Sequence, residues 1–237
     1  MDNKVGVKNR VKSLITIIIL SIIFLLFMIP FILVIINSFK SKRDIIVDPL
    51  SITPESGFTI DNFIEAFTKM DFTKSFSNSF LITSVSTILV LILAAMLAYY
   101  FVRNNNRITK MFFPLMVASM IIPFQAIMIP LVTIYGSGFN LLNNRGTLIF
   151  FHVGFGMSMS VFMYHGFVKS SIPIELEEAA YIDGSTKLQT FFMVVLPLLK
   201  PTTATLAILN VLEYWNDYLL PSLVLTRKEL LTIPLST

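Results

Sequence analysis

Long uncharged hydrophobic runs, separated by short polar links, dominate the residue pattern of this chain. A helix needs roughly 20 residues to cross a bilayer, and five of the runs reach that length. The sequence therefore predicts an all-α, polytopic membrane helix bundle. The predicted spans cover about 14–37, 79–102, 111–135, 147–168 and 202–225.

The composition supports a membrane protein. Hydrophobic residues make up 55% of the chain and charged residues only 14%, whereas soluble domains carry about 25% charged residues. The net charge of +4 comes from scattered residues that form no basic, aromatic-interleaved face, so no nucleic-acid partner is expected. With no cysteine and two histidines, disulfides and thiol catalysis are excluded and no metal site is predicted.

The first hydrophobic run follows a basic head at residues 1–13. A basic head before an apolar run is also typical of a secretory signal. This run is too long for one, has no small-residue cleavage site and is followed by further spans. We therefore predict an uncleaved first helix and a transmembrane domain over 14–237.

Basic residues at short links indicate the orientation, because they favour the cytoplasmic side. The head carries four, and Arg103, Arg107 and Lys110 crowd the link between the second and third spans. The N-terminus and the segment 169–201 are thus predicted to be cytoplasmic. The opposite loop, 38–78, also carries basic residues, among them Lys40, Lys42 and Arg43, which weakens the bias. Its helical spacing of Ile60, Phe63, Ile64 and Phe67 predicts a short amphipathic helix near Thr59.

Prolines mark the third and fifth spans. Pro114, Pro123 and Pro130 should kink the third span, and the fifth should be interrupted near Pro221. Prolines at membrane depth need neighbouring protein or cavity water to satisfy the freed carbonyls. The third span is therefore expected inside the bundle.

The segment 169–201 has the pattern of a helix, a sharp bend and a second helix. Pro173 and the acidic residues that follow it suit a helix N-terminus. Asp183-Gly184 should end that helix, and Thr186 with Gln189 matches a capping box that starts the next. The sequence predicts a compact cytoplasmic projection.

This segment resembles the cytoplasmic EAA loop of bacterial ABC importer permeases. The resemblance rests on Glu178-Ala179-Ala180, on Gly184 and on Val194-Val195-Leu196-Pro197, with Val194 where isoleucine is usual. It extends over essentially the whole chain and is similar in detail to the carbohydrate-uptake branch, in particular the maltose-importer-type permease with six helices. The segments that carry this closer resemblance are Asn78-Ser79, Ala180–Gly184, Leu196–Pro201 and Trp215-Asn216-Asp217-Tyr218.

The resemblance implies a coupling helix that binds a separate ATPase and switches the bundle between inward and outward access. It implies, as partners, a second and non-identical permease, two ATPase subunits and an extracytoplasmic solute-binding protein, in the bacterial cytoplasmic membrane. The solute would be a sugar, an oligosaccharide or a related polyol. The residues assigned to ATPase coupling are Glu178, Ala179, Ala180, Asp183, Gly184, Leu196 and Pro197.

The resemblance also implies a sixth span, whereas the sequence ends soon after the fifth. Residues 231–235 are similar to the lead-in to that sixth helix. We therefore expect the chain to be a fragment or a truncated reading frame.

The fifth span carries the candidate translocation pathway. Asn210, Glu213 and Asp217 share one helical face, and ionisable groups inside a span usually face a cavity or a partner. Tyr214 and Trp215 are side chains that stack on sugar rings. The alternative, that Trp215 and Asp217 lie at the outer interface as belt residues, stays open.

Two other classes of protein share single features with this sequence. An intramembrane serine protease would use Ser158 and a histidine, but the small residues Gly154, Gly156, Ser158 and Ser160 favour helix packing. His152 and His165 are interpreted as helix–helix hydrogen-bond partners. An ion-coupled secondary transporter would need midplane charges and a repeat, and no repeat is visible.

No phosphate-binding loop is present, because Gly184-Ser185-Thr186-Lys187 has the letters of that motif in the wrong order. We therefore predict a non-enzymatic transport subunit without a cofactor of its own. ATP and Mg²⁺ are expected on the partner ATPase.

Overall fold

The computed structural model describes the backbone from Asp2 to Thr237, and the side chains of residue 10 and of residues 12–237. Within these residues every regular element is a helix and no strand occurs. The all-α prediction is confirmed. Lys4 and Lys8 of the basic head lie outside the residues whose side chains are described.

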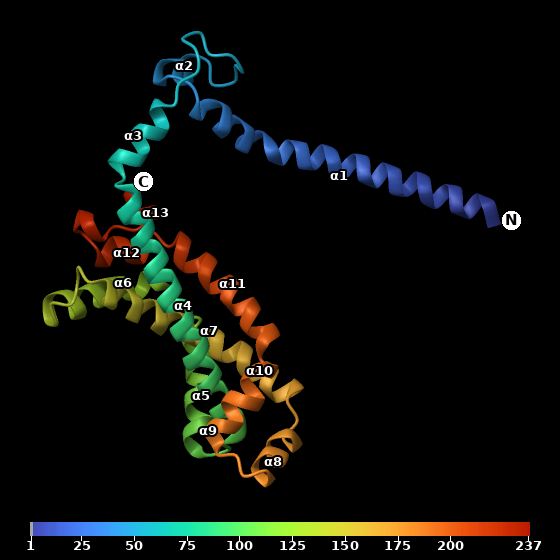
Figure 1. The fold of residues 1–237 in the computed structure, drawn as a ribbon, viewed down its shortest axis with the longest axis vertical. Helices are drawn as coiled ribbons and strands as arrows, with labels where there is room; N and C mark the ends of the chain where they lie inside the picture. Colours follow the sequence, from blue (N-terminus) through green and yellow to red (C-terminus); the bar gives the residue numbers. More distant parts are fainter. Residues whose placement is uncertain (1) are drawn as a thin grey trace. The chain divides into compact units, whose positions relative to one another are not determined.

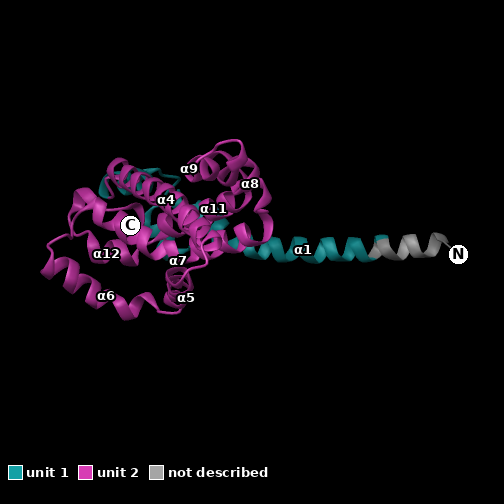
Figure 2. Ribbon diagram, turned by 90° about the horizontal axis from the view of Figure 1, so that it is seen from below, with its two compact units in different colours: residues 1–69 teal, residues 70–237 magenta. Residues whose placement is uncertain are grey.

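The chain divides into two compact units, one up to Lys69 and one from Met70 to Thr237 (Figure 2). The first unit contains α1 (Asp2–Ser38), α2 (Lys42–Val47) and α3 (Asp61–Lys69). From Lys12 to Ser38, α1 is long and apolar enough to cross a membrane, and within this unit none of these residues is buried.

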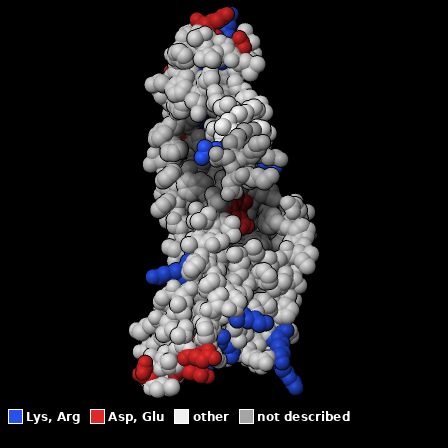
Figure 3. Space-filling model, turned by 90° about the vertical axis from the view of Figure 1, so that its right-hand side faces the viewer, with Lys and Arg blue, Asp and Glu red and all other residues white. Residues whose placement is uncertain are grey.

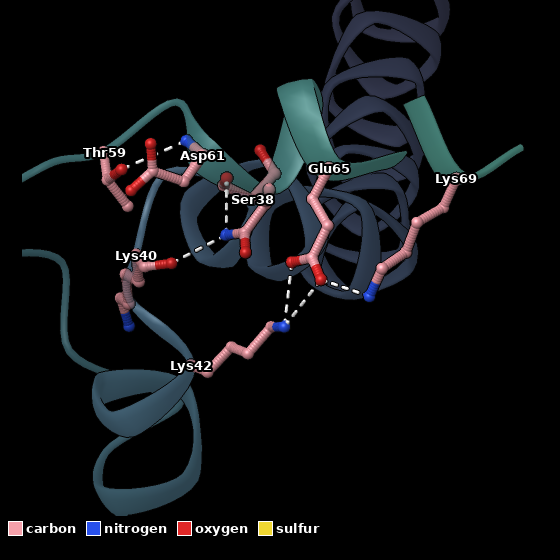
Figure 4. A network of polar contacts seen from close by, with 8 residues as sticks. Ser38, Lys40, Lys42, Thr59, Asp61, Glu65 and Lys69 are labelled. Atoms are coloured by element: carbon pink, nitrogen blue, oxygen red, sulfur yellow. Dashed lines mark hydrogen bonds and ion pairs between the residues drawn. The ribbon is translucent and has the colours of Figure 1, made fainter. Parts of the chain in front are cut away.

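Side-chain hydrogen bonds hold the polar part of the first unit together (Figure 4). The Asn62 amide donates to the carbonyls of Ser38 and Lys40 at 3.1 and 2.7 Å, so α3 is tied to the end of α1. Thr59 Oγ1 accepts from the backbone N–H of Asp61 at 3.0 Å. The predicted amphipathic helix thus exists as α3, and it begins two residues after Thr59.

In the second unit, α4 (Phe72–Arg103) lies along α7 (Arg145–Ser171) and α11 (Lys200–Asn216) (Figure 1). Small residues of α4 let these helices approach closely, since Ala94, Ala95 and Ala98 are all fully buried. They pack in one apolar cluster with α7, α11 and the segment between these two helices. The other buried members of the cluster are Phe101, Val161, Tyr164, Val168, Ile172, Phe191, Val195, Leu199 and Leu206.

The third predicted span is not one helix. It consists of α5 (Arg107–Ser119), α6 (Phe124–Val132) and a π-helical turn, η1 (Thr133–Gly138). α5 and the α6–η1 rod meet at a bend of 99°. Of its three prolines only Pro123 stands at the break, because Pro114 and Pro130 lie inside helices.

The expected position of this segment inside the complete bundle stays a prediction, since this chain by itself buries few of its residues. In α5 and α6 only Thr109 and Leu131 are buried.

The fifth predicted span breaks earlier than expected. α11 ends at Asn216, and α12 (Leu219–Val224) follows after Asp217 and Tyr218. Pro221 lies in the first turn of α12, where a backbone N–H has no partner within the helix in any case. The Asp217 carboxylate accepts from the backbone N–H of Leu220 at 3.3 Å. The fifth span is therefore interrupted at Asp217-Tyr218, close to the predicted position near Pro221.

The residues after α12 return to the beginning of α4 (Figure 1). They contain η3 (Lys228–Leu230) and α13 (Ile233–Ser236). The Asn78 amide donates to the carbonyls of Glu229 and Leu231 at 3.0 and 2.9 Å. This segment is thus held on α4 although it lies about 150 positions away in the sequence.

In the part of the chain that the structure describes, three helices are long and apolar enough to cross a membrane by themselves. They are α1 from Lys12, α4 and α7. Two further helix pairs pass the same criterion if each bent pair is taken as one span. These pairs are Arg107–Ser119 with Phe124–Gly138, and Lys187–Leu198 with Lys200–Asn216, the second bent by 75°.

Candidate functional site

The EAA loop, residues 169–201, folds as a helix, a turn and a broken helix. Its elements are α8 (Glu175–Ile182), α9 (Lys187–Thr190), the π-helical turn η2 (Phe191–Val195) and α10 (Leu196–Leu198). In Figure 1 α8 and α9 lie at one end of the second unit. Figure 3 shows acidic and basic side chains gathered at this end.

The bend between α8 and α9 has the predicted chemistry. Gly184 has a φ of +88°, a conformation that a residue with a Cβ rarely adopts. Thr186 Oγ1 accepts from the backbone N–H of Gln189 at 3.3 Å, and Gln189 Oε1 accepts from that of Thr186 at 2.8 Å. The predicted capping box is confirmed.

The residues that the sequence assigns to ATPase coupling lie mostly on the surface. Ala180 and Leu196 are half-buried, and the other five are exposed. Within the described part of the chain the Glu178 carboxylate has no hydrogen bond or ion pair. The exposed five are Glu178, Ala179, Asp183, Gly184 and Pro197.

The buried acid of α8 is Glu177. From the sequence it is predicted only to be one of the acidic residues at a helix N-terminus. Its side chain is 3% exposed, and Oε1 accepts from Arg103 Nε at 2.7 Å. Tyr99 Oη donates to Oε2 at 2.7 Å. Arg103 also donates from Nη2 to the carbonyl of Ile172 at 2.8 Å. Three elements, α4, α7 and α8, therefore meet at one buried polar cluster.

A second feature of this unit is a cavity of about 880 Å³ among α5, α6, α7, α11 and α12. Aromatic rings and a few polar groups line it together, including Phe124, Phe155, Glu213, Tyr214 and Asp217.

Two of the five predicted pathway residues do not line this cavity. Asn210 is buried against α7, with Nδ2 donating to Leu206 O at 2.8 Å and to Ser160 Oγ at 3.4 Å. Trp215 packs edge-on against Phe76, with ring centroids 5.6 Å apart. Helical spacing put Asn210, Glu213 and Asp217 on one face, but α7 covers the Asn210 part of that face.

His152 connects α7 to the break between α11 and α12. Its Nε2 lies 3.0 Å from Asp217 Oδ2, and its ring stacks on Tyr214 with centroids 4.5 Å apart. Tyr214 Oη donates to the carbonyl of His152 at 3.0 Å. The predicted helix–helix hydrogen bonding is confirmed for His152. His165 instead stacks on Phe113 of α5, with centroids 3.9 Å apart.

The small residues of α7 divide into two kinds. A Cβ at Gly156 would overlap the Tyr214 hydroxyl oxygen and would lie 3.2 Å from Asn210 Oδ1. Gly156 and Ser160 therefore serve close packing against α11. Gly154 and Ser158 line the cavity instead.

Among the described residues, neither histidine is a hydrogen-bond partner of Ser158. Its hydroxyl oxygen lies 2.9 Å from that of Ser119, and both histidines have the other contacts described above. Among the described side chains, no group of three His, Cys, Asp or Glu residues could hold a metal ion.

A helical membrane bundle with an exposed bent loop and a lateral cavity defines a polytopic transport subunit. The family described as the binding-protein-dependent transport system inner membrane component matches residues 90–236, and the chain belongs to this family. That membership supports the importer permease, and neither the serine protease nor the ion-coupled transporter.

Sequence relatives cover most of the chain. The probable starch degradation products transport system permease protein AmyC of Thermoanaerobacterium thermosulfurigenes is 40% identical over 89% of this chain and 75% of that protein. The melibiose/raffinose/stachyose import permease protein MelC of Bacillus subtilis is 37% identical over 80% of this chain and 67% of that protein.

A solved structure shares the fold. It is a bacterial ABC transporter involved in the import of the acidic polysaccharide alginate. The match covers 96% of this chain and 78% of the other, with a TM-score of 0.80 and 23% sequence identity.

Proposed function

We propose that this chain is one permease subunit of an ATP-binding-cassette importer for a sugar or oligosaccharide. The names of two relatives refer to starch degradation products and to melibiose, raffinose and stachyose. A third relative, the multiple sugar-binding transport system permease protein MsmG of Streptococcus mutans, is 34% identical over 89% of this chain and 76% of that protein. All three names concern carbohydrates, which supports this solute class.

The proposal of a separate ATPase subunit rests on the exposed face of α8. Glu178 and Ala179 are exposed beside a glycine bend that gives the loop a fixed direction, while Glu177 on the other side of the helix holds it to the bundle. An exposed acid without an internal partner suits a basic groove on a separate ATPase. ATP and Mg²⁺ would be bound there, and this subunit would hydrolyse nothing.

The remaining partners and the orientation belong to the same proposal. A second, non-identical permease would complete the pathway, and a solute-binding protein would deliver the sugar at the outer side. The N-terminus, the link 103–110 and the EAA loop would face the cytoplasm, as their basic residues favour.

The cavity is the proposed wall of the translocation pathway in this subunit. Aromatic faces with carboxylates among them suit a polyhydroxylated solute, because the rings stack on sugar faces and the carboxylates accept from hydroxyls. Glu213, Tyr214 and Asp217 would contact the solute or its water. Asn210 and Trp215 would not contact the solute. They would hold α11 against α7 and α4.

Replacement of Gly184 tests the motor connection. Gly184→Val forces a β-branched residue into a positive φ without a steric clash, since no atom lies within 4 Å of its would-be Cβ. We expect ATP-driven sugar uptake in proteoliposomes of the full importer to be lost, with the chain still in the membrane. Gly57→Val is a matched control, because Gly57 has a φ of +83° and equally open surroundings outside the EAA loop.

Two results would contradict the proposal. One is unchanged uptake by the Gly184 variant, and the other is failure of any ATPase subunit to co-purify with the unaltered chain.

A further inference from the structure

We propose that Arg103, Glu177 and Tyr99 form a positioning cluster that transfers movement of α8 directly to α4. The inference rests on the proposed function, because it concerns how a displacement of α8 by the ATPase is passed to the helices of the bundle. Along the chain, α8 is joined to α7 before it and to α9 after it. The side-chain cluster joins it to α4.

The geometry makes this junction stiff. Arg103 Nε and Tyr99 Oη each lie 2.7 Å from one of the two Glu177 carboxylate oxygens, so the carboxylate is held at both ends. The Glu177 side chain is 3% exposed and that of Arg103 17%. A buried charge that loses its partner is costly. The pair therefore stays together when α8 is displaced.

The cluster also fixes the direction of α8. Arg103 Nη2 donates to the carbonyl of Ile172 at the end of α7. The Tyr99 ring contacts Phe191 in η2, with centroids 5.3 Å apart. One turn of α4 thus contacts Ile172 near the start of the EAA loop, α8 and η2. A force on α8 therefore cannot rotate this helix about its connection to α7 without also moving α4.

At its other end, α4 holds the segment that follows α12. Besides the two hydrogen bonds from Asn78, Ser79 Oγ accepts from the backbone N–H of Ile233 at 2.9 Å. α4 is one continuous helix of 32 residues between these two junctions. A displacement taken up at Arg103 therefore reaches the residues 229–233 at the opposite end of the same rod.

The test replaces the ion pair without leaving a buried charge. In the double variant Arg103→Met with Glu177→Leu, apolar side chains of similar volume fill the site, a change that is often neutral for stability. We expect normal membrane abundance, normal ATPase co-purification and normal basal ATP hydrolysis. Sugar taken up per ATP hydrolysed should fall roughly two- to thirty-fold, the range that positions along a coupling path produce.

Two further variants accompany it. Tyr99→Phe keeps the contact with Phe191 and the ion pair and deletes one hydrogen bond, so a smaller fall in the same ratio is expected. Arg107→Met is the matched control, because Arg107 is an exposed basic residue near the same end of the bundle, and within the described chain it has no hydrogen bond or ion pair. It should leave the ratio unchanged.

The outcomes separate the two proposals. If Gly184→Val uncouples transport and the double variant does not, the positioning cluster is refuted and the proposed function stands. If the double variant loses the ATPase itself, the cluster serves assembly and the inference is again refuted. If no ATPase binds the unaltered chain, the proposed function is refuted, and the inference with it.

Discussion

Two glutamates in this chain have basic partners in opposite environments. Glu177 is buried in the second unit against Arg103. Glu65, in the first unit, lies between Lys42 and Lys69, whose side chains are each 71% exposed (Figure 4). The chemistry of the two sites is similar, but water reaches only one of them.

This difference decides what each ion pair contributes. Exposed pairs are screened and add little to stability, so the lysines around Glu65 are replaceable. A buried pair cannot be opened without leaving a desolvated charge, and Glu177 therefore fixes the position of α8. Four predictions test whether burial or charge determines how much a contact contributes to stability, and they follow in order of decreasing expected effect.

The largest effect is predicted for a buried charge without its partner. Arg103→Met alone should destabilise the second unit by about 3–5 kcal/mol, because the Glu177 carboxylate stays behind unpaired. The Arg103→Met and Glu177→Leu double variant should recover most of that loss. Thermal unfolding of the purified importer, followed for this subunit, measures both. Equal losses in the single and double variants would contradict the view that the stranded charge is the cause.

Burial without charge is tested at Gly156. Gly156→Ala brings a Cβ onto the Tyr214 hydroxyl oxygen, and overpacking of this kind typically costs about 1–3 kcal/mol. Adding Tyr214→Phe removes that oxygen and should restore part of the loss. Gly154→Ala is the control, since no atom lies within 4 Å of its would-be Cβ. A Gly156 variant as stable as the control would show that α7 and α11 are less tightly packed than described.

Local features of the EAA loop could be predicted from the sequence because their partners lie close along the chain. The capping box joins Thr186 to Gln189, three positions away, and the positive φ of Gly184 belongs to one residue. Hydrophobic run length was equally sufficient for α1, α4 and α7. Such signals need no knowledge of the tertiary structure.

Features that depend on distant partners could not be predicted. Arg103 and Glu177 are 74 positions apart, and in the sequence each already had an explanation, one as a link residue and one as a helix N-terminal acid. Likewise, three prolines looked equivalent in the third span, but only Pro123 stands at the break. Spacing placed Asn210 on the face of Glu213 and Asp217, but only the packing of α7 shows that Asn210 is covered.

A neutral and exposed contact should have an intermediate effect. Thr186→Ala removes the acceptor for the backbone N–H of Gln189, and loss of a helix N-cap costs about 0.5–2 kcal/mol. We expect faster amide exchange in α9, with α4 and α7 unaffected. Thr186→Ser keeps the acceptor and should behave as the unaltered chain. Unchanged exchange in the alanine variant would mean that tertiary packing alone holds α9.

The smallest effect is predicted for the exposed charge of Glu65. Hydrogen bonds from Lys42 and then Lys69 lower the pKa of its carboxyl from 4.5 to about 2. A lowered pKa stabilises the folded form above pH 4.5, and this contribution is lost as the pH falls from 4.5 towards 2. Protease protection of the segment 39–69 should therefore decline across that window.

Two controls locate this effect. Glu65→Gln should reduce the decline to the part that Asp44 contributes, because a hydrogen bond from Ser56 lowers the pKa of the Asp44 carboxyl as well. Glu55→Gln, which changes an exposed acid outside the cluster, should keep the full decline. Salt distinguishes the two glutamates most directly, because at about 1 M the Debye length falls to about 3 Å and exposed pairs are screened. Such salt should erase the contribution of Glu65 and leave the effect of Arg103→Met unchanged. If salt weakened both equally, water would reach Glu177 as well, and a stiff junction between α4 and α8 could not be maintained.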